Sequence, residues 1–241
     1  MNYYIITGSS RGIGRALVDQ LTNDPENEVI GIARSYQQAK KNYHHIEFDL
    51  GNIEELKSQV SHFFETVKAP KRVVLINNAG TLGEIGHVGS LSADGLEQVM
   101  NLNVTTPTIL MNEFVRQFSG VQAEKVILNI SSGAGKYPVD GWSAYCASKS
   151  ALDLFSKVVA EECILNENDI KVFSVAPGVV DTEMQSQIRE AAPEQFRTKG
   201  KFVKLKEEQM LSAPASVAQK LLEVINFPDR FSEVLLDVRK F

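Results

Sequence analysis

Cysteine is scarce in this chain of 241 residues, which has only Cys146 and Cys163. Both fall within one predicted helix, at a spacing that matches no metal or redox motif, so we expect reduced thiols. The four histidines do not cluster with cysteines or carboxylates, and we predict no metal site. The adjacent His44 and His45 would point to opposite faces of an extended segment.

Long apolar runs and an excess of basic residues are also missing. No run approaches the roughly 18 residues of a transmembrane helix. The net charge of -5 and a pI near 5.5 argue against binding to nucleic acid or to an anionic membrane surface. The first residues lack the basic start of a signal peptide, and the last match no targeting motif. We therefore expect a cytoplasmic protein with a small-molecule partner.

What the sequence does contain is a regular alternation of short apolar runs and amphipathic stretches. Hydrophobic residues make up 43% and charged residues 23%, as in an ordinary globular protein. Runs rich in Ile and Val without polar alternation are typical of strands buried on both faces. The predicted strands are Tyr3–Thr7, Val29–Ala33, His45–Phe48, Arg72–Asn77, Lys125–Ile130, Lys171–Ala176 and Glu233–Val238. The predicted helices are Gly14–Thr22, Ile53–Val67, Ala93–Phe118, Ser143–Leu165 and Ala215–Asn226.

This βαβα alternation predicts an α/β fold: a doubly wound, parallel seven-stranded sheet of Rossmann-like type with helices on both faces. No linker, repeat or low-complexity tract interrupts it, so we expect a single domain over residues 1–241. The charged stretch from Thr182 to Leu211 has helix fragments but no strand pattern. It is predicted to lie over the carboxyl edge of the sheet as a lid, the alternative being a solvated surface excursion.

The segment TGSSRGIG, from Thr7 to Gly14, joins the first strand to the first helix. Glycines at positions 8, 12 and 14 allow a tight turn and a close approach of backbone N–H groups to a phosphate. The helix N-terminus adds oriented donors for a dinucleotide diphosphate. The spacing G-x-x-x-G-x-G differs from the common G-x-G-x-x-G.

Two arginines favour a phosphorylated cofactor. Arg11 lies at a helix N-terminus, where a cation opposes the helix dipole unless an anion binds nearby. Arg34 ends the second strand, where NAD-binding proteins usually carry Asp or Glu, whereas an Arg accommodates a 2′-phosphate. We therefore predict NADP(H). The alternative is that both arginines are solvated surface residues.

A second segment, SSGAGKYPVDGWSAYCASK from Ser131 to Lys149, carries groups suited to proton transfer. Tyr145 and Lys149 are four residues apart and share one helix face. A neighbouring ammonium, together with the positive nicotinamide of an oxidised cofactor, would lower the phenol's pKa. Ser132 ends a predicted strand and would polarise a carbonyl, although a turn or cap residue is the alternative. A second Y-x-x-x-K match, from Tyr36 to Lys40, lacks an upstream serine and is interpreted as surface.

Over essentially its full length the chain resembles the short-chain dehydrogenase/reductase family. The resemblance implies the catalytic residues Asn103, Ser132, Tyr145 and Lys149. In addition to Asn103, Tyr145 and Lys149, it implies cofactor contacts from Gly8, Ser10, Arg11, Gly12, Ile13, Gly14, Arg34, Asp49, Asn78, Ala79, Gly80, Pro177, Gly178, Val180 and Thr182. Tyr145 would donate the proton, Lys149 would bind the nicotinamide ribose, and Asn103 would support a water-linked relay to Lys149.

A narrower resemblance is to benzil (diketone) reductases and sepiapterin reductases, carried by GWSAYCASKSALDLF and by the tail KLLEVINFPDRFSEVLLDVRKF. It implies that Asp237 contacts the substrate, although Asp237 also reads as a simple strand end. Trp142 would suit a flat aromatic substrate or belong to the core.

Three functions follow from these observations. The leading hypothesis is an NADPH-dependent carbonyl reductase that acts on an α-diketone such as benzil or a related aromatic dicarbonyl. The second is reduction of a sepiapterin-like side chain, and the third is an NADP-binding sensor or scaffold without turnover. The wide apolar arc of the helix at 143–165 and the pairing of such helices in the family predict a homodimer.

Overall fold

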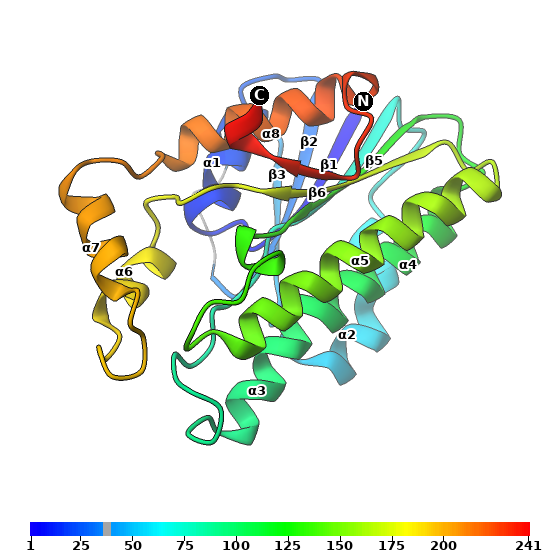
Figure 1. Ribbon diagram of the computed structural model, residues 1–241. Helices are drawn as coiled ribbons and strands as arrows, with labels where there is room; N and C mark the ends of the chain where they lie inside the picture. The colour runs from blue at the N-terminus through cyan, green and yellow to red at the C-terminus, as the bar shows by residue number, and fades with distance from the viewer. Residues whose placement is uncertain (36–39) are drawn as a thin grey trace.

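The computed structural model describes residues 1–35 and 40–241, and within them one parallel sheet carries seven strands in the order β3-β2-β1-β4-β5-β6-β7 (Figure 1). The strands are β1 Asn2–Thr7, β2 Asn27–Ala33, β3 Tyr43–Glu47, β4 Arg72–Asn77, β5 Glu124–Ile130, β6 Ile170–Ala176 and β7 Leu235–Asp237. The predicted doubly wound sheet is confirmed. The last strand is shorter than predicted, because Val238 already belongs to the 3-10 turn η5, Val238–Lys240.

Helices cover both faces of the sheet (Figure 1). On one face lie α1, Gly12–Leu21, and α8, Pro214–Asn226; on the other lie α2, Ile53–Gln59, α4, Thr106–Phe118, and α5, Ser143–Leu165. A hydrophobic core lies on each face of the sheet, and successive strand residues point into opposite cores. Tyr4 and Ile6 pack toward α1 and α8, whereas Ile5 packs toward α4 and α5. All of these strand side chains are almost fully buried, which is why the runs lack polar alternation.

Two predicted helices are interrupted. The expected helix 93–118 consists of α3, Ala93–Met100, a π-helical turn η2, Asn101–Thr105, and α4. Pro107 has no N–H, so the α-helical donor to the carbonyl of Asn103 is missing at this turn. The expected helix 53–67 ends early at Gln59 and continues as the 3-10 turn η1, Val60–Phe64, which turns Val60 and Phe63 into the core.

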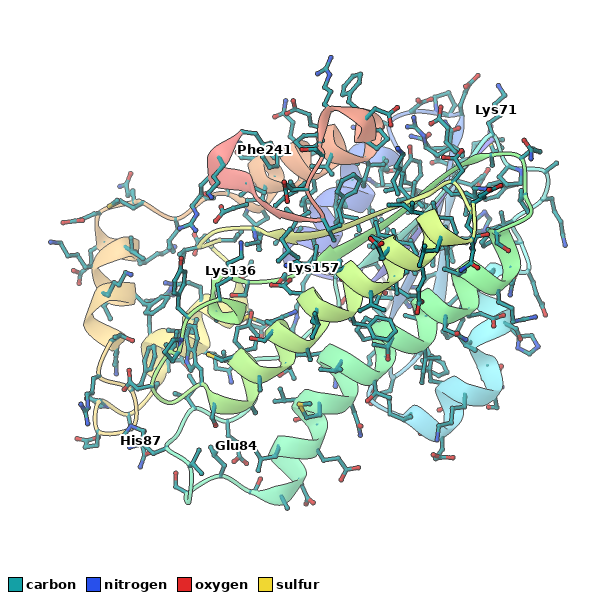
Figure 2. The ribbon with its side chains drawn as sticks, turned by 45° about the vertical axis from the view of Figure 1, so that its right-hand side comes forward. Lys71, Glu84, His87, Lys136, Lys157 and Phe241 are labelled. Atoms are coloured by element: carbon teal, nitrogen blue, oxygen red, sulfur yellow. The ribbon has the colours of Figure 1, made fainter. Side chains whose placement is uncertain are left out.

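The segment after β6 is built as the sequence predicts, from helix pieces. It holds α6, Glu183–Glu190, and α7, Lys199–Glu207, which stand beyond the carboxyl edge of the sheet (Figure 1). A single bridge joins Val180 to Ser212 across its base. The remaining 3-10 turns are η3, Gly133–Gly135, and η4, Pro228–Arg230. At the far end of the chain, Phe241 lies beside α8 (Figure 2), where Lys220 Nζ donates to the carbonyl of Val238 at 2.7 Å.

Within residues 1–35 and 40–241, no helix has the length and apolar character needed to cross a membrane. The same residues contain no group of three or more His, Cys, Asp or Glu placed to hold a metal ion.

Candidate active site

A cleft of about 1690 Å³ runs along the carboxyl ends of the strands. It opens where the strand order reverses, between β1 and β4, because the chain winds from β1 outward to β3 and then crosses to β4. Such crevices are where doubly wound sheets bind ligands. The volume exceeds that of an ordinary small-ligand pocket and leaves room for a dinucleotide and a substrate together.

The glycine turn after β1 forms one end of the cleft. Gly8 and Gly12 have φ angles of 65° and 56°, which favour glycine. A Cβ at Gly14 would lie 2.2 Å from the carbonyl oxygen of Gly8, so only glycine fits this close approach. Helix α1 begins with neither a side-chain cap nor an acidic residue in its first turn, so its N–H groups are available to an anion. The turn therefore fits a diphosphate.

The segment after β4 braces this turn. Asn78 donates from its side-chain amide to the carbonyl oxygens of Thr7 and Gly8, both at 3.0 Å. The backbone N–H groups of Asn78 and Ala79 donate to Thr7 Oγ1, also at 3.0 Å. These hydrogen bonds hold together the loops that follow β1 and β4, whose residues are 70 positions apart in sequence. The sequence predicted Asn78 and Ala79 as cofactor contacts but did not reveal this bracing.

Arg34 lies exposed at the end of β2 and lines the cleft beside Ala33 and Ser35, with no carboxylate at this strand end. Arg11 also lines the cleft, but its guanidinium forms an ion pair with Glu183 at the start of α6. From the sequence, Arg11 is expected to face a bound anion or solvent, whereas in the structure its partner is a protein carboxylate. Tyr36 of the second Y-x-x-x-K match lies outside the described residues, while Lys40 pairs with Asp19 at 2.8 Å.

Three of the predicted site residues do not line the cleft. Gly14 faces the Gly8 carbonyl, Asn103 bonds to its neighbours, and Asp237 is engaged by Arg239. The predicted residues that do line it are Gly8, Ser10, Arg11, Gly12, Ile13, Arg34, Asp49, Asn78, Ala79, Gly80, Ser132, Trp142, Tyr145, Lys149, Pro177, Gly178, Val180 and Thr182. They come from the ends of six strands, β1 to β6, and from the start of α5, which the fold brings to one edge.

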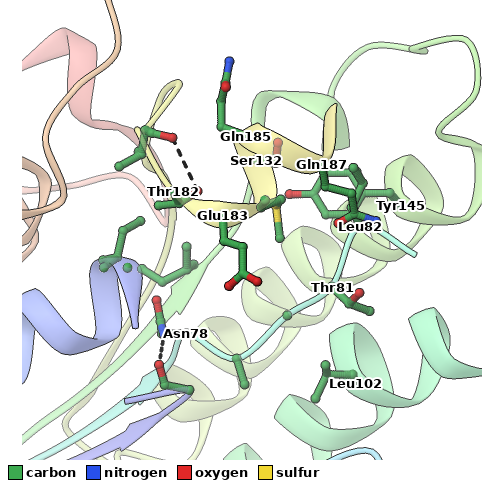
Figure 3. Close-up of a pocket in the computed structure, with 18 of the residues that line it drawn as sticks. Asn78, Thr81, Leu82, Leu102, Ser132, Tyr145, Thr182, Glu183, Gln185 and Gln187 are labelled. Atoms are coloured by element: carbon green, nitrogen blue, oxygen red, sulfur yellow. Dashed lines mark hydrogen bonds between the residues drawn. The ribbon is translucent and has the colours of Figure 1, made fainter. Parts of the chain in front are cut away.

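Tyr145 and Ser132 face each other in the middle of the cleft (Figure 3). The tyrosine is 7% exposed. Burial raises the pKa of its phenol, while a hydrogen bond with Ser132 acts to lower it. The sequence led us to expect a lowered pKa. In the structure, the effect of burial on the phenol pKa is larger than the opposite effect of the hydrogen bond with Ser132. The phenol is therefore protonated at neutral pH, in the form that can donate.

Lys149 lies one turn further along α5 and is also buried. Its Nζ donates to the carbonyl of Ile130 at 2.8 Å and lies 5.8 Å from the centre of the Tyr145 ring. Burial lowers the pKa of the ammonium to about 8, whereas the charge of Asp153 raises it. A Cβ at Gly80 would lie 3.6 Å from this Nζ and 3.3 Å from Asn103 Oδ1. Because glycine has no side chain, the space beside the Lys149 ammonium stays open.

Asn103 occupies the π-helical turn and is fixed by three hydrogen bonds. Its Nδ2 donates to the carbonyl of Thr81 at 2.8 Å and to Ser148 Oγ at 3.0 Å, and its Oδ1 accepts from the N–H of Thr81 at 2.9 Å. Ser148 in turn donates to the carbonyl of Tyr145 at 2.8 Å. The side chain thus ties the loop after β4 to α5. Pro107 has no N–H, so it cannot donate to the backbone carbonyl of Asn103 as the fourth residue along an α-helix would.

An aromatic cluster forms the wall beside Tyr145. Trp142 stacks on Phe196 with ring centres 5.1 Å apart and 12° between planes, and meets Tyr145 edge-on at 5.7 Å. Phe202 of α7 also contacts the indole. The sequence identified Trp142, but Phe196 and Phe202 were missed because the charged segment around them hid two isolated apolar residues. Over the same cleft, the amide of Gln185 turns away from Tyr145 (Figure 3).

Asp237 is bound by Arg239 rather than directed into the cleft. Its Oδ1 accepts from Arg239 Nε at 2.8 Å and its Oδ2 from Nη2 at 2.5 Å. This pairing lowers the pKa of the carboxyl to about 2. Arg239, not Asp237, lines the cleft. Contact of Asp237 with a substrate stays a prediction.

Comparison with known proteins agrees with this architecture. The sequence profile described as short chain dehydrogenase matches residues 2–193. A benzil reductase ((S)-benzoin forming) of Bacillus cereus is 36% identical, with 95% of this chain and 96% of the relative covered. A sepiapterin reductase of Rattus norvegicus is 33% identical over 92% and 90%. The solved structure of a 4-hydroxyisoleucine dehydrogenase complexed with NADH superposes with a TM-score of 0.80 at 26% identity, over 98% of this chain and 96% of that one.

Proposed function

Because the chain belongs to the short chain dehydrogenase family, whose members bind a nicotinamide cofactor, we propose that it is an NADPH-dependent carbonyl reductase acting on an aromatic α-diketone. One observation carries the reductase assignment. Ser132, Tyr145 and Lys149 converge in the cleft whose other end is the glycine turn of residues 8–14. A proton donor and a diphosphate site on one edge are what hydride transfer to a carbonyl requires.

The residues of the cleft fit the cofactor. The uncapped start of α1 and the turn at Gly8 and Gly12 would hold the diphosphate, and Arg34 would hold a 2′-phosphate. Thr182, Val180 and the 177–178 turn would bind the nicotinamide end. When bound, the dinucleotide supplies the hydride.

The protein's own groups complete the reaction. Ser132 donates a hydrogen bond that orients the substrate carbonyl and stabilises the charge that develops on its oxygen. Tyr145, protonated at neutral pH, gives its proton to that oxygen. Lys149, as an ammonium, would bind the ribose and stabilise the phenolate that remains. A water-linked relay that Asn103 supports and that passes through Lys149 would then return a proton to Tyr145. The Trp142–Phe196–Phe202 wall excludes water from this step.

The aromatic wall supports the diketone as the substrate. Trp142 and Phe202 line the cleft beside the proton donor, with the buried Phe196 stacked on the indole, and they offer an apolar surface to an aryl group. Relatives at 36% identity are benzil reductases. The sepiapterin reductase relatives favour a second candidate, a pterin that carries a side-chain diketone. A substrate panel with benzil, sepiapterin and simple aldehydes distinguishes the two. We expect the highest kcat/KM with benzil, and a preference for sepiapterin would select the second candidate.

We also propose that the protein is a homodimer through α5. Leu154 and Val158 lie one turn apart and are 65% and 45% exposed, next to the exposed Phe155. Such an apolar stripe on a long helix is typical of a subunit interface.

The double substitution Leu154→Glu with Val158→Glu is expected to convert the dimer to a monomer in sedimentation velocity, because four carboxylates would then meet across the pair. Val88→Glu is the matched control, since Val88 is 83% exposed in a loop after β4. A wild-type protein that sediments as a monomer would refute this assignment.

A further inference from the structure

Asp153 is a buried carboxylate that the mechanism above does not use. It lies on α5 one turn after Lys149 and is 7% exposed. Its Oδ1 accepts a hydrogen bond from Ser174 Oγ on β6 at 2.7 Å. Its Oδ2 faces the η3 turn, since a Cβ at Gly135 would lie 3.1 Å from it. The carboxylate is therefore enclosed by α5, β6 and the turn that follows Ser132.

Lys149 and Asp153 are two buried opposite charges on one helix face. Side chains of residues four apart lie one above the other, and the later one leans back over the earlier turn. They do not form a direct ion pair in the described structure: the ammonium donates to the Ile130 carbonyl instead. A buried ammonium is costly without a nearby negative charge. Asp153 supplies that charge without occupying the donors that Lys149 needs for a ribose.

The other groups around Lys149 do not duplicate this role. On its own helix Tyr145 is a neutral phenol, and the neighbouring loop and π-turn present the uncharged Gly80 and Asn103. Lys136, which follows the η3 turn after β5 (Figure 2), carries a positive charge that helps to lower the pKa of the Asp237 carboxyl. At the end of β7, Asp237 and Arg239 neutralise each other. Asp153 is the negative charge that acts on Lys149 and raises its pKa.

We propose that Asp153 is a positioning residue that keeps Lys149 in its ammonium form by its charge, while Ser174 and the Gly135 turn fix where that charge lies. The inference rests on the proposed function of the same site and adds a residue to it. It also gives Ser174, a strand residue behind the site, a role in fixing the carboxylate.

The test is the pH profile of kcat/KM in Asp153→Asn. Wild-type activity is expected to fall as the pH rises through about 8, because Lys149 then loses its proton. In Asp153→Asn the fall is expected to begin about one pH unit lower. At alkaline pH, kcat/KM of Asp153→Asn would then be roughly tenfold below that of the wild type. At a pH well below the alkaline fall, which is called the alkaline limb, the two values would be similar.

Four further measurements keep the test specific. Asp153→Ser, a second neutral and smaller replacement, must give the same shift, and Asp153→Glu must restore the wild-type limb. Glu161→Gln removes an exposed charge two turns further along α5 and must leave the limb unchanged. An equal loss at every pH in Asp153→Asn would mean a structural role and overturn the proposal. If the wild type reduces no carbonyl, the proposed function fails. The role of Asp153 is then tested in the same variants by the pH dependence of NADPH binding, measured by fluorescence.

Discussion

Tyr145→Phe is expected to lower kcat for carbonyl reduction by about 10³-fold while NADPH binding stays within about twofold of wild type. The substitution removes only the hydroxyl that faces Ser132. The ring keeps its edge contact with Trp142 at 5.7 Å and its position over the Lys149 ammonium, so the fold is preserved. The measurement is steady-state turnover together with a fluorescence titration of the reduced cofactor.

The cleft offers a matched control for this variant. Tyr137 lines the same cleft but is 71% exposed, and Tyr137→Phe is expected to change kcat by less than about threefold. Equal turnover of Tyr145→Phe and wild type would contradict the mechanism. Loss of turnover together with loss of cofactor binding would show instead that the substitution had damaged the site.

Arg34→Ala is expected to raise the KM for NADPH by about 10- to 100-fold and to leave the KM for NADH unchanged. Arg34 lines the cleft at the end of β2, and a charge-assisted hydrogen bond contributes about 1.5–3 kcal/mol. NADH lacks the 2′-phosphate and forms no such bond with Arg34, so the substitution leaves its binding unchanged. Kinetics with both cofactors measure the change in preference directly.

Arg230→Ala is the control for the loss of one positive charge. Its guanidinium lies over the Phe227 ring, 4.1 Å from the ring centre, and does not line the cleft. It should leave both KM values unchanged. A wild-type protein that already prefers NADH, or an Arg34→Ala variant with equal losses for the two cofactors, would contradict the role of Arg34.

The sheet could be predicted because its strands are buried on both faces. Runs such as VILNI at 126–130 have no alternation to mislead, and the glycine turn and the Tyr145–Lys149 spacing are local patterns. The interruption at Asn101–Thr105 was missed, although Pro107 marks it in the sequence. An amphipathic period continues across a single π turn, so periodicity alone joins α3 to α4.

Other features depend on residues far apart in the chain. Arg11 and Glu183 are separated by 172 positions, and the stacking of Trp142 on Phe196 by more than fifty. No local pattern reports either contact, since each arises only when α6 and the segment that follows it fold over the sheet edge. The pairing of Asp237 with Arg239 is local, but a two-residue spacing does not by itself show that both carboxylate oxygens will be engaged.

The most direct test of the account is the oxidation of NADPH by the purified protein with benzil as substrate, with NADH measured in parallel. We expect turnover with NADPH, formation of the hydroxy ketone, and a kcat/KM with NADH lower by about tenfold or more. Bound NADPH without turnover of benzil, sepiapterin or simple aldehydes and ketones would contradict the reductase assignment. It would favour instead an NADP-binding sensor or scaffold without turnover.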